Sequence, residues 1–208
     1  MPHAAFIPLS SLHDRATGWF DHAHAALLGA LPCRHGCSAC CWGPFGVTAL
    51  DVAELQRGLA SLDPTVRRGI EERARAHRTV LEASHPQLRE SPFLDNWSDA
   101  DRDVVAERFD ELPCPALDTD GSCLVYAFRP VTCRMMGIPT ESGGLVEGAC
   151  EVQTAVPLVR LPAAIREEED RFTEQEAAAL ERLRDDAPLA GDEVWLAYGF
   201  LTDRGPLL

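Results

Sequence analysis

Four of the eight cysteines of this chain lie close together, at Cys33, Cys37, Cys40 and Cys41. Cysteines that only fill a core would not gather in this way, whereas a metal ion needs several thiolates that converge on one point. Gaps of two and three residues let a tight turn direct the sulfurs to one side, and Gly36 eases such a turn. We therefore expect this segment to be irregular and to supply metal ligands.

The other four cysteines are spread along the chain, at Cys114, Cys123, Cys133 and Cys150. They are separated by 8, 9 and 16 residues, so local geometry alone cannot join them into a site. Folding could bring them onto the first group, and eight thiols would then match two four-thiolate sites, or one site with a bridged or partly open second. The adjacent Cys40 and Cys41 would each serve a different centre, or one would be a ligand while the other packs or is redox active.

The compartment decides how such cysteines are interpreted. The first thirty residues lack a basic start followed by an unbroken apolar run, so we expect no secretory signal. No run of about 18 apolar residues occurs, so we expect no membrane span. In a cytoplasmic chain disulfides rarely persist, and clustered cysteines then indicate metal binding or catalysis rather than a disulfide scaffold.

The charge of the chain excludes several classes of function. It has 33 acidic and 19 basic residues, for a net charge of -14, and every basic residue is arginine. This balance argues against nucleic acid as a partner, and the absence of lysine excludes a P-loop lysine or a Schiff-base lysine. Residues 161–208 hold 12 acidic residues and 5 arginines, about half of the net charge. We expect an acidic helical segment there, which is a solvated surface or binds a basic protein or peptide.

Periodic apolar residues and capping residues predict most of the chain as helix. The caps are Thr48 with Asp51, and Asp63 with Pro64. Residues 194–201 suit a last helix and a strand equally. The expected helices are residues 11–30, 48–62, 63–84, 98–109 and 173–186.

A different pattern marks residues 122–133. Turn residues precede a short β-prone run from Cys123 to Tyr126, which Pro130 ends, so we expect a small hairpin or an irregular arm. The predicted fold class is therefore mainly α, with an irregular, cysteine-rich metal-binding region at residues 33–150 and a short β-hairpin or arm. Length and composition favour a single domain over residues 1–208.

Arginines accompany both groups of cysteines, at Arg34, Arg129 and Arg134. Four thiolates around a divalent metal ion leave a net negative charge, so we expect the N–H groups of these arginines to bond to the sulfurs around the cofactor. The alternative is that Arg129 and Arg134 pair with surface carboxylates such as Asp118 or Asp120.

Three segments that carry these residues resemble a known family. The segments are Cys33-x3-Cys37-x2-Cys40-Cys41, Cys114-Pro115 with Gly121-Ser122-Cys123, and Arg129-Pro130-x2-Cys133-Arg134. Their order is similar to that of the YkgJ-type cysteine-cluster family, whose members are described as zinc- or iron-chelating, or as iron–sulfur proteins. The shorter form of the family's motif has two residues between its first two cysteines, where this chain has three. The resemblance implies metal chelation and assigns no reaction.

Thiolate ligands alone permit either zinc or an iron–sulfur cluster. The irregular spacing and the adjacent pair favour an iron–sulfur cluster, with 4Fe–4S first, over the paired knuckles of a zinc ribbon. Our leading hypothesis is an iron–sulfur protein with a redox or modification role. The alternatives are a structural zinc protein that presents an interaction surface, and a thiol oxidoreductase that uses Cys40 and Cys41 as a reversible pair. The sequence identifies no catalytic residue and leaves open whether the protein is an enzyme.

Overall fold

The computed structural model describes residues 9–27, 31, 36–142, 144–148, 150, 152, 156, 158–186 and 191–201. Cys33 and Arg34 lie outside these residues. The described chain is mainly helical, with short antiparallel strands and a cysteine-rich region, which confirms the predicted fold class. It divides into two compact units, one made of Met1–His35 with Val131–Asp186 and the other of Gly36–Pro130 with Ala187–Leu208. Compactness does not establish independent folding, so the single domain over residues 1–208 stays a prediction.

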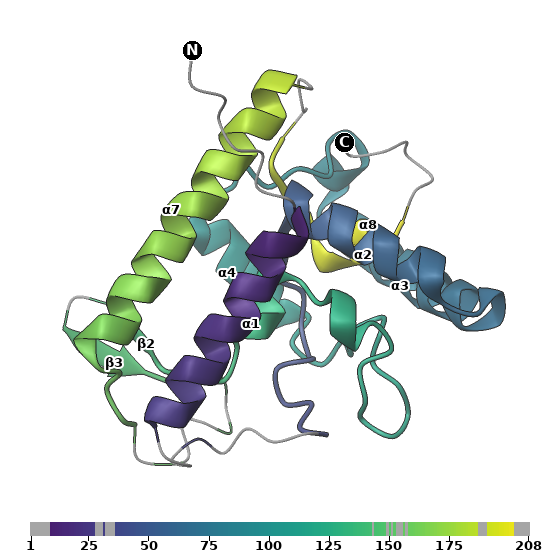
Figure 1. Ribbon diagram of the computed structural model, residues 1–208. Helices are drawn as coiled ribbons and strands as arrows, with labels where there is room; N and C mark the ends of the chain where they lie inside the picture. The colour runs from purple at the N-terminus through teal and green to yellow at the C-terminus, as the bar shows by residue number, and fades with distance from the viewer. Residues whose placement is uncertain are drawn as a thin grey trace. The chain divides into compact units, whose positions relative to one another are not determined.

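Two long helices, α1 (Leu9–Ala26) and α7 (Ala163–Asp186), pack side by side in the first unit (Figure 1). The Trp19 indole N–H donates to the Ile165 carbonyl oxygen at 3.0 Å, and His22 Nδ1 lies 3.2 Å from the Glu168 carboxylate. The short helix α5 (Val131–Met135) also packs against α1. Their shared core consists of Trp19, Ala23, Leu27, Ile138 and Leu161.

The second unit contains α2 (Ala49–Ser61), α3 (Pro64–Ser84), α4 (Asp99–Arg108) and α8 (Leu196–Gly199). The capping residues predicted for α2 and α3 are confirmed. Thr48 Oγ1 accepts the Asp51 N–H at 3.3 Å, and Asp51 Oδ2 accepts the Thr48 N–H at 3.2 Å. Asp63 Oδ1 accepts the Thr65 N–H at 2.8 Å. These bonds satisfy amide groups that the first turn of each helix leaves without a backbone acceptor.

A small sheet closes the core of the second unit. Strand β1 (Gly46–Thr48) pairs antiparallel with β4 (Glu193–Trp195), with Val47 opposite Val194. Residues 194–201, which suited helix and strand equally, contain both, because α8 follows β4 directly. The sheet and helices bury Leu55, Ile70, Leu81 and Phe200, among others.

One local prediction is wrong, and another holds. The long helix α7 begins at Ala163 rather than at Thr173, whose hydroxyl donates to the Glu169 carbonyl oxygen at 3.1 Å inside the helix. Residues 122–133 form the expected arm: Cys123 makes an isolated antiparallel bridge with Leu117, and the 3₁₀ turn η2 (Tyr126–Phe128) and the start of α5 follow. A hairpin of named strands comes later and pairs β2 (Thr140–Ser142) with β3 (Leu145–Glu147).

The described helices also bear on the expected absence of a membrane span. None of them is both long enough and apolar enough to cross a bilayer.

Candidate metal centre

The first cysteine segment is joined directly to the second by backbone hydrogen bonds. The Cys41 N–H donates to the Ser38 carbonyl oxygen at 2.9 Å, which closes a tight turn that contains both adjacent cysteines. The Cys114 N–H then donates to the Cys41 carbonyl oxygen at 2.7 Å. An antiparallel bridge between Trp42 and Pro113 follows. Cysteines far apart in the sequence are therefore neighbours in the fold.

A compact loop places Cys123 next to Cys114. The Leu124 N–H donates to the Ala116 carbonyl oxygen at 2.9 Å, and Leu117 forms a bridge with Cys123. The loop turns at Gly121, whose φ of 84° lies in the left-handed region that glycine adopts without strain. Both cysteine side chains are half-buried and pack against the hydrophobic core of the second unit.

Electrostatic effects also link Cys40, Cys41, Cys114 and Cys123, which we call the thiol cluster. The hydrogen bond with the Cys41 thiol lowers the pKa of Cys40 to about 6, although burial opposes this change. Burial raises the pKa of Cys114 to about 12, and the neighbouring Cys123 adds to the increase. Burial also raises the pKa of Cys123, and Cys40 contributes in the same direction. The four thiols therefore form one connected group.

Arg129 is one of the cations of this region. Its charge lowers the pKa values of both Cys40 and Cys123, after the larger effects of hydrogen bonding and burial. The guanidinium carbon lies 3.7 Å from the centre of the Tyr126 ring, and Nε donates to the Tyr126 carbonyl oxygen at 3.1 Å. Sequence reasoning missed Tyr126, although its spacing of three residues from Arg129 in a turn was a usable signal. Its exposed ring holds the guanidinium near the thiols.

Four other predicted site residues, Cys37, Cys133, Cys150 and Arg134, lie elsewhere in the described chain. Cys37 is half-buried on the segment that leads to the thiol cluster. Cys133 and Cys150 belong to the first unit, and Cys133 lies on α5. Arg134 is 8% exposed, and its Nη1 donates to Thr17 Oγ1 on α1 at 2.7 Å. No disulfide joins any of the seven described cysteines.

The thiol cluster supplies sulfur atoms, which are the type of ligand that a thiophilic metal prefers. Cys40 is poised as a thiolate, Arg129 supplies positive charge, and the buried Cys114 would exchange its proton for the metal. Within the described ranges, no three His, Cys, Asp or Glu side chains already converge in the arrangement that holds a metal ion.

The fold and the thiols define a mainly helical protein with a cysteine-rich centre. Residues 32–151 match the family model described as "CxxCxxCC: putative zinc- or iron-chelating domain". The match spans more than half of the chain and includes all eight cysteines, so the protein belongs to this family, as the sequence motifs indicated. No curated protein and no solved structure matches the chain.

Proposed function

We propose that the cysteines of this protein hold an iron–sulfur centre, of the 4Fe–4S type, that serves a redox or modification role. The observation that carries the proposal is the thiol cluster, in which the 2.7 Å bond from Cys114 to Cys41 joins two distant segments. An iron–sulfur centre supplies one-electron transfer when it is bound. The chain's own part is to supply sulfur ligands and to place Arg129 near them.

Two features favour iron over zinc. Cys40 and Cys41 are adjacent, so the cysteines are spaced more closely and less regularly than in the paired knuckles of a structural zinc site. Arg129 also lies where its charge acts on two of the thiols. Charge and hydrogen bonding near the sulfurs are the means by which proteins set the potential of an iron–sulfur centre.

Anaerobic purification followed by metal analysis tests this assignment. We expect iron and acid-labile sulfide together, with a visible charge-transfer absorption that bleaches on reduction. Stoichiometric zinc without iron or sulfide would contradict the proposal and support a structural zinc protein, whose cysteine region should unfold when the metal is removed. A chain that purifies with neither metal, even after reconstitution, would contradict metal binding altogether.

Cysteine variants locate the ligands. We expect Cys40→Ser and Cys123→Ser each to lose most of the bound metal, because an alcohol is a poor substitute for a thiolate. Ser38→Ala is the matched control, since it changes the same turn but keeps the backbone carbonyl that accepts the Cys41 N–H. Equal metal content in all three variants would contradict the proposed ligands.

A second candidate, a thiol oxidoreductase, is favoured by one observation. Cys40 has a lowered pKa and an adjacent thiol, the combination that makes a cysteine nucleophilic near neutral pH. In metal-free protein, the oxidant diamide would take two protons and two electrons from Cys40 and Cys41 and be reduced to its hydrazine, as the two S–H bonds break and one S–S bond forms. Mass spectrometry of the peptide that contains both residues checks this step. Retention of both free thiols at excess diamide would contradict it.

A further inference from the structure

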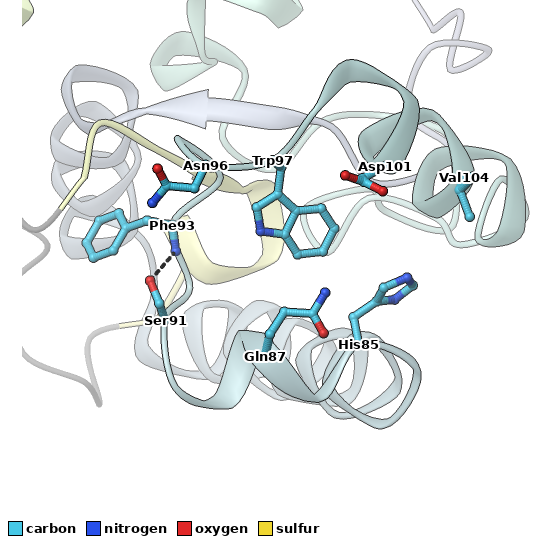
Figure 2. Close-up of a pocket in the computed structure, with 8 residues that line it drawn as sticks. All are labelled: His85, Gln87, Ser91, Phe93, Asn96, Trp97, Asp101 and Val104. Atoms are coloured by element: carbon cyan, nitrogen blue, oxygen red, sulfur yellow. Dashed lines mark hydrogen bonds between the residues drawn. The ribbon is translucent and has the colours of Figure 1, made fainter.

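A pocket outside the cysteine segments lies between the end of α3 and the first turns of α4. It encloses about 430 Å³, within the range of about 300 to 1,000 Å³ that is usual for small-ligand sites. Gln87, Asn96 and Val104 are exposed at its edge, so the pocket opens to solvent. Figure 2 shows the Trp97 indole between Asn96 and Asp101, with Gln87 and His85 on the opposite side.

The Trp97 indole is a fixed aromatic wall of this pocket. The Trp195 ring meets it edge-on, with the ring centres 6.1 Å apart, and the His85 ring lies 5.7 Å away at 46°. The backbone N–H of Trp97 donates to the Leu94 carbonyl oxygen at 2.9 Å, and the backbone N–H of Leu94 donates to the Glu193 carbonyl oxygen on β4 at 2.9 Å. Packing and backbone bonds thus hold the ring in place before any ligand arrives.

The polar groups around Trp97 favour a cation. Asp101 carries the formal negative charge of the lining, and Ser98 Oγ donates to its carboxylate at 2.7 Å. Burial lowers the pKa of His85, with Arg108 acting in the same direction and Asp101 opposing it. His85 is therefore neutral at neutral pH, and Asp101 is the one charged side chain among the residues that line the pocket.

The nearby arginines leave this charge without a salt bridge. Arg102 Nη1 pairs with the Glu193 carboxylate at 2.5 Å, and its Nη2 donates to the Leu94 carbonyl oxygen. Arg108 lies against the Phe109 ring, 5.6 Å from its centre. Among the described residues, Asp101 forms no ion pair. A ligand could therefore supply its positive partner.

We propose that this pocket binds the guanidinium group of an arginine residue in a partner protein or peptide. Trp is the aromatic side chain that attracts cations most strongly, and a planar guanidinium can stack on it while its N–H fork bonds to a carboxylate. The chain already uses such stacking, since Arg129 lies 3.7 Å from the Tyr126 ring centre and Arg57 lies 5.2 Å from that of Phe128. The amide oxygens of Gln87 and Asn96 can accept the other N–H groups.

The source of the arginine is argued from charge and access. The net charge of -14 attracts a basic partner over a long range. The open rim, where Val104 is 57% exposed, leaves room for the backbone of a peptide. Because the pocket contains none of the cysteines, this inference does not depend on which metal the protein holds.

NMR titration of the full-length protein tests the proposal. The probes are N-acetyl-L-arginine amide, the neutral isostere N-acetyl-L-citrulline amide and free L-arginine. We expect the arginine amide to shift the Trp97 indole N–H signal saturably. The citrulline amide should leave this signal unchanged. The Trp42 indole, which is 49% exposed, is an internal control that should not move. Equal shifts with citrulline, or at both indoles, would overturn the proposal.

A charge-matched pair of variants tests the role of Asp101. Asp99→Asn and Asp101→Asn remove the same charge from the first turn of α4, but only Asp101 lines the pocket. We expect Asp101→Asn to weaken binding about tenfold, the order expected for loss of one charged hydrogen bond, and Asp99→Asn to have little effect. Equal affinities for the two variants, each with an unchanged circular dichroism spectrum, would overturn the proposed contact. Tighter binding of free L-arginine than of its blocked amide would overturn the assignment to a peptide residue.

Discussion

Cys40 and Cys114 belong to the same thiol cluster, but their surroundings change their pKa values in opposite directions. The Cys41 thiol favours the Cys40 thiolate, whereas Cys114 packs against the core, where an unpaired charge is costly. Proximity alone therefore does not make a cysteine reactive. A metal bound here would have to displace a proton from Cys114, so the two thiols would respond differently to pH as the metal binds.

Alkylation of the metal-free, reduced protein should reveal this difference. Because the pKa of Cys40 is lowered to about 6, its reaction with iodoacetamide should accelerate between pH 5 and 7 and then level off. Cys114, whose pKa is raised to about 12, should stay unmodified over the same range. Peptide mapping by mass spectrometry measures both rates. A Cys40 rate that continues to rise steeply up to pH 9 would contradict the lowered pKa.

Substitution of Cys41 should show what lowers the pKa of Cys40. In metal-free Cys41→Ala the hydrogen bond is lost, so the pKa of Cys40 should rise towards its ordinary value of 9.0, and alkylation at pH 6 should slow at least about tenfold. Cys41→Ser keeps an O–H donor and should preserve most of the original rate. If the serine and alanine variants have the same pH profile, the hydrogen bond is not the cause.

The residue types of the site could be predicted, but their neighbours could not. Spacing predicted that the cysteines are ligands because four thiols so close together have few other uses, and that assignment stays a prediction. It did not indicate that Cys41 lies beside Cys114, because that contact depends on a backbone bond between residues 73 positions apart. Arg129 was singled out, but Tyr126, on which it stacks, was taken as part of a β-prone run.

At the scale of elements, contact between α2 and η2 holds in place the segment that follows Cys123. A Cβ at Gly58 would lie 2.7 Å from Phe128 Cβ, so Gly58→Ala should push the turn away from the helix. We expect a loss of about 1 to 3 kcal/mol in the free energy of unfolding, as for other overpacked sites. Urea denaturation followed by circular dichroism measures it.

Gly69 on α3 provides the matched control. A Cβ there would meet only Arg73 Nη1, at 3.6 Å, which is an ordinary contact with a flexible side chain. Gly69→Ala should therefore gain about 0.5 to 1 kcal/mol from helix propensity alone. If the two alanine variants shift stability in the same direction, close packing of Phe128 is not what requires glycine at position 58.

Elements set by local chemistry were predictable, and those set by distant partners were not. The cap at Asp63 and Pro64 marked the start of α3 correctly because its hydrogen bond is made within three residues. Thr173 resembled a cap in sequence, but its hydroxyl bonds to Glu169 inside a helix that starts after Pro162. Val194 is a strand residue because Val47 and Phe93, both distant in the sequence, pair with it.

At the scale of the whole molecule, the family's region crosses both compact units. Residues 32–151 include most of the second unit and the start of the later segment of the first, with Cys133 and Cys150. The helices α1 and α7 are held together differently, by an apolar core and by contacts such as that of Trp19 with Ile165. Metal should thus support the cysteine segments more than it supports this helix pair.

Hydrogen exchange after metal removal tests that expectation. Under reducing conditions, a chelator should increase amide exchange in residues 36–43 and 112–124, because metal–sulfur bonds there add to the few backbone bonds that join them. Exchange in α7 should stay unchanged, since its contacts with α1 need no cysteine. Cys114→Ser should reproduce the pattern without a chelator. An equal increase of amide exchange in α7 would mean that the metal stabilises the helix pair as well. Unchanged exchange in the cysteine segments would mean that the metal does not bind at the thiol cluster.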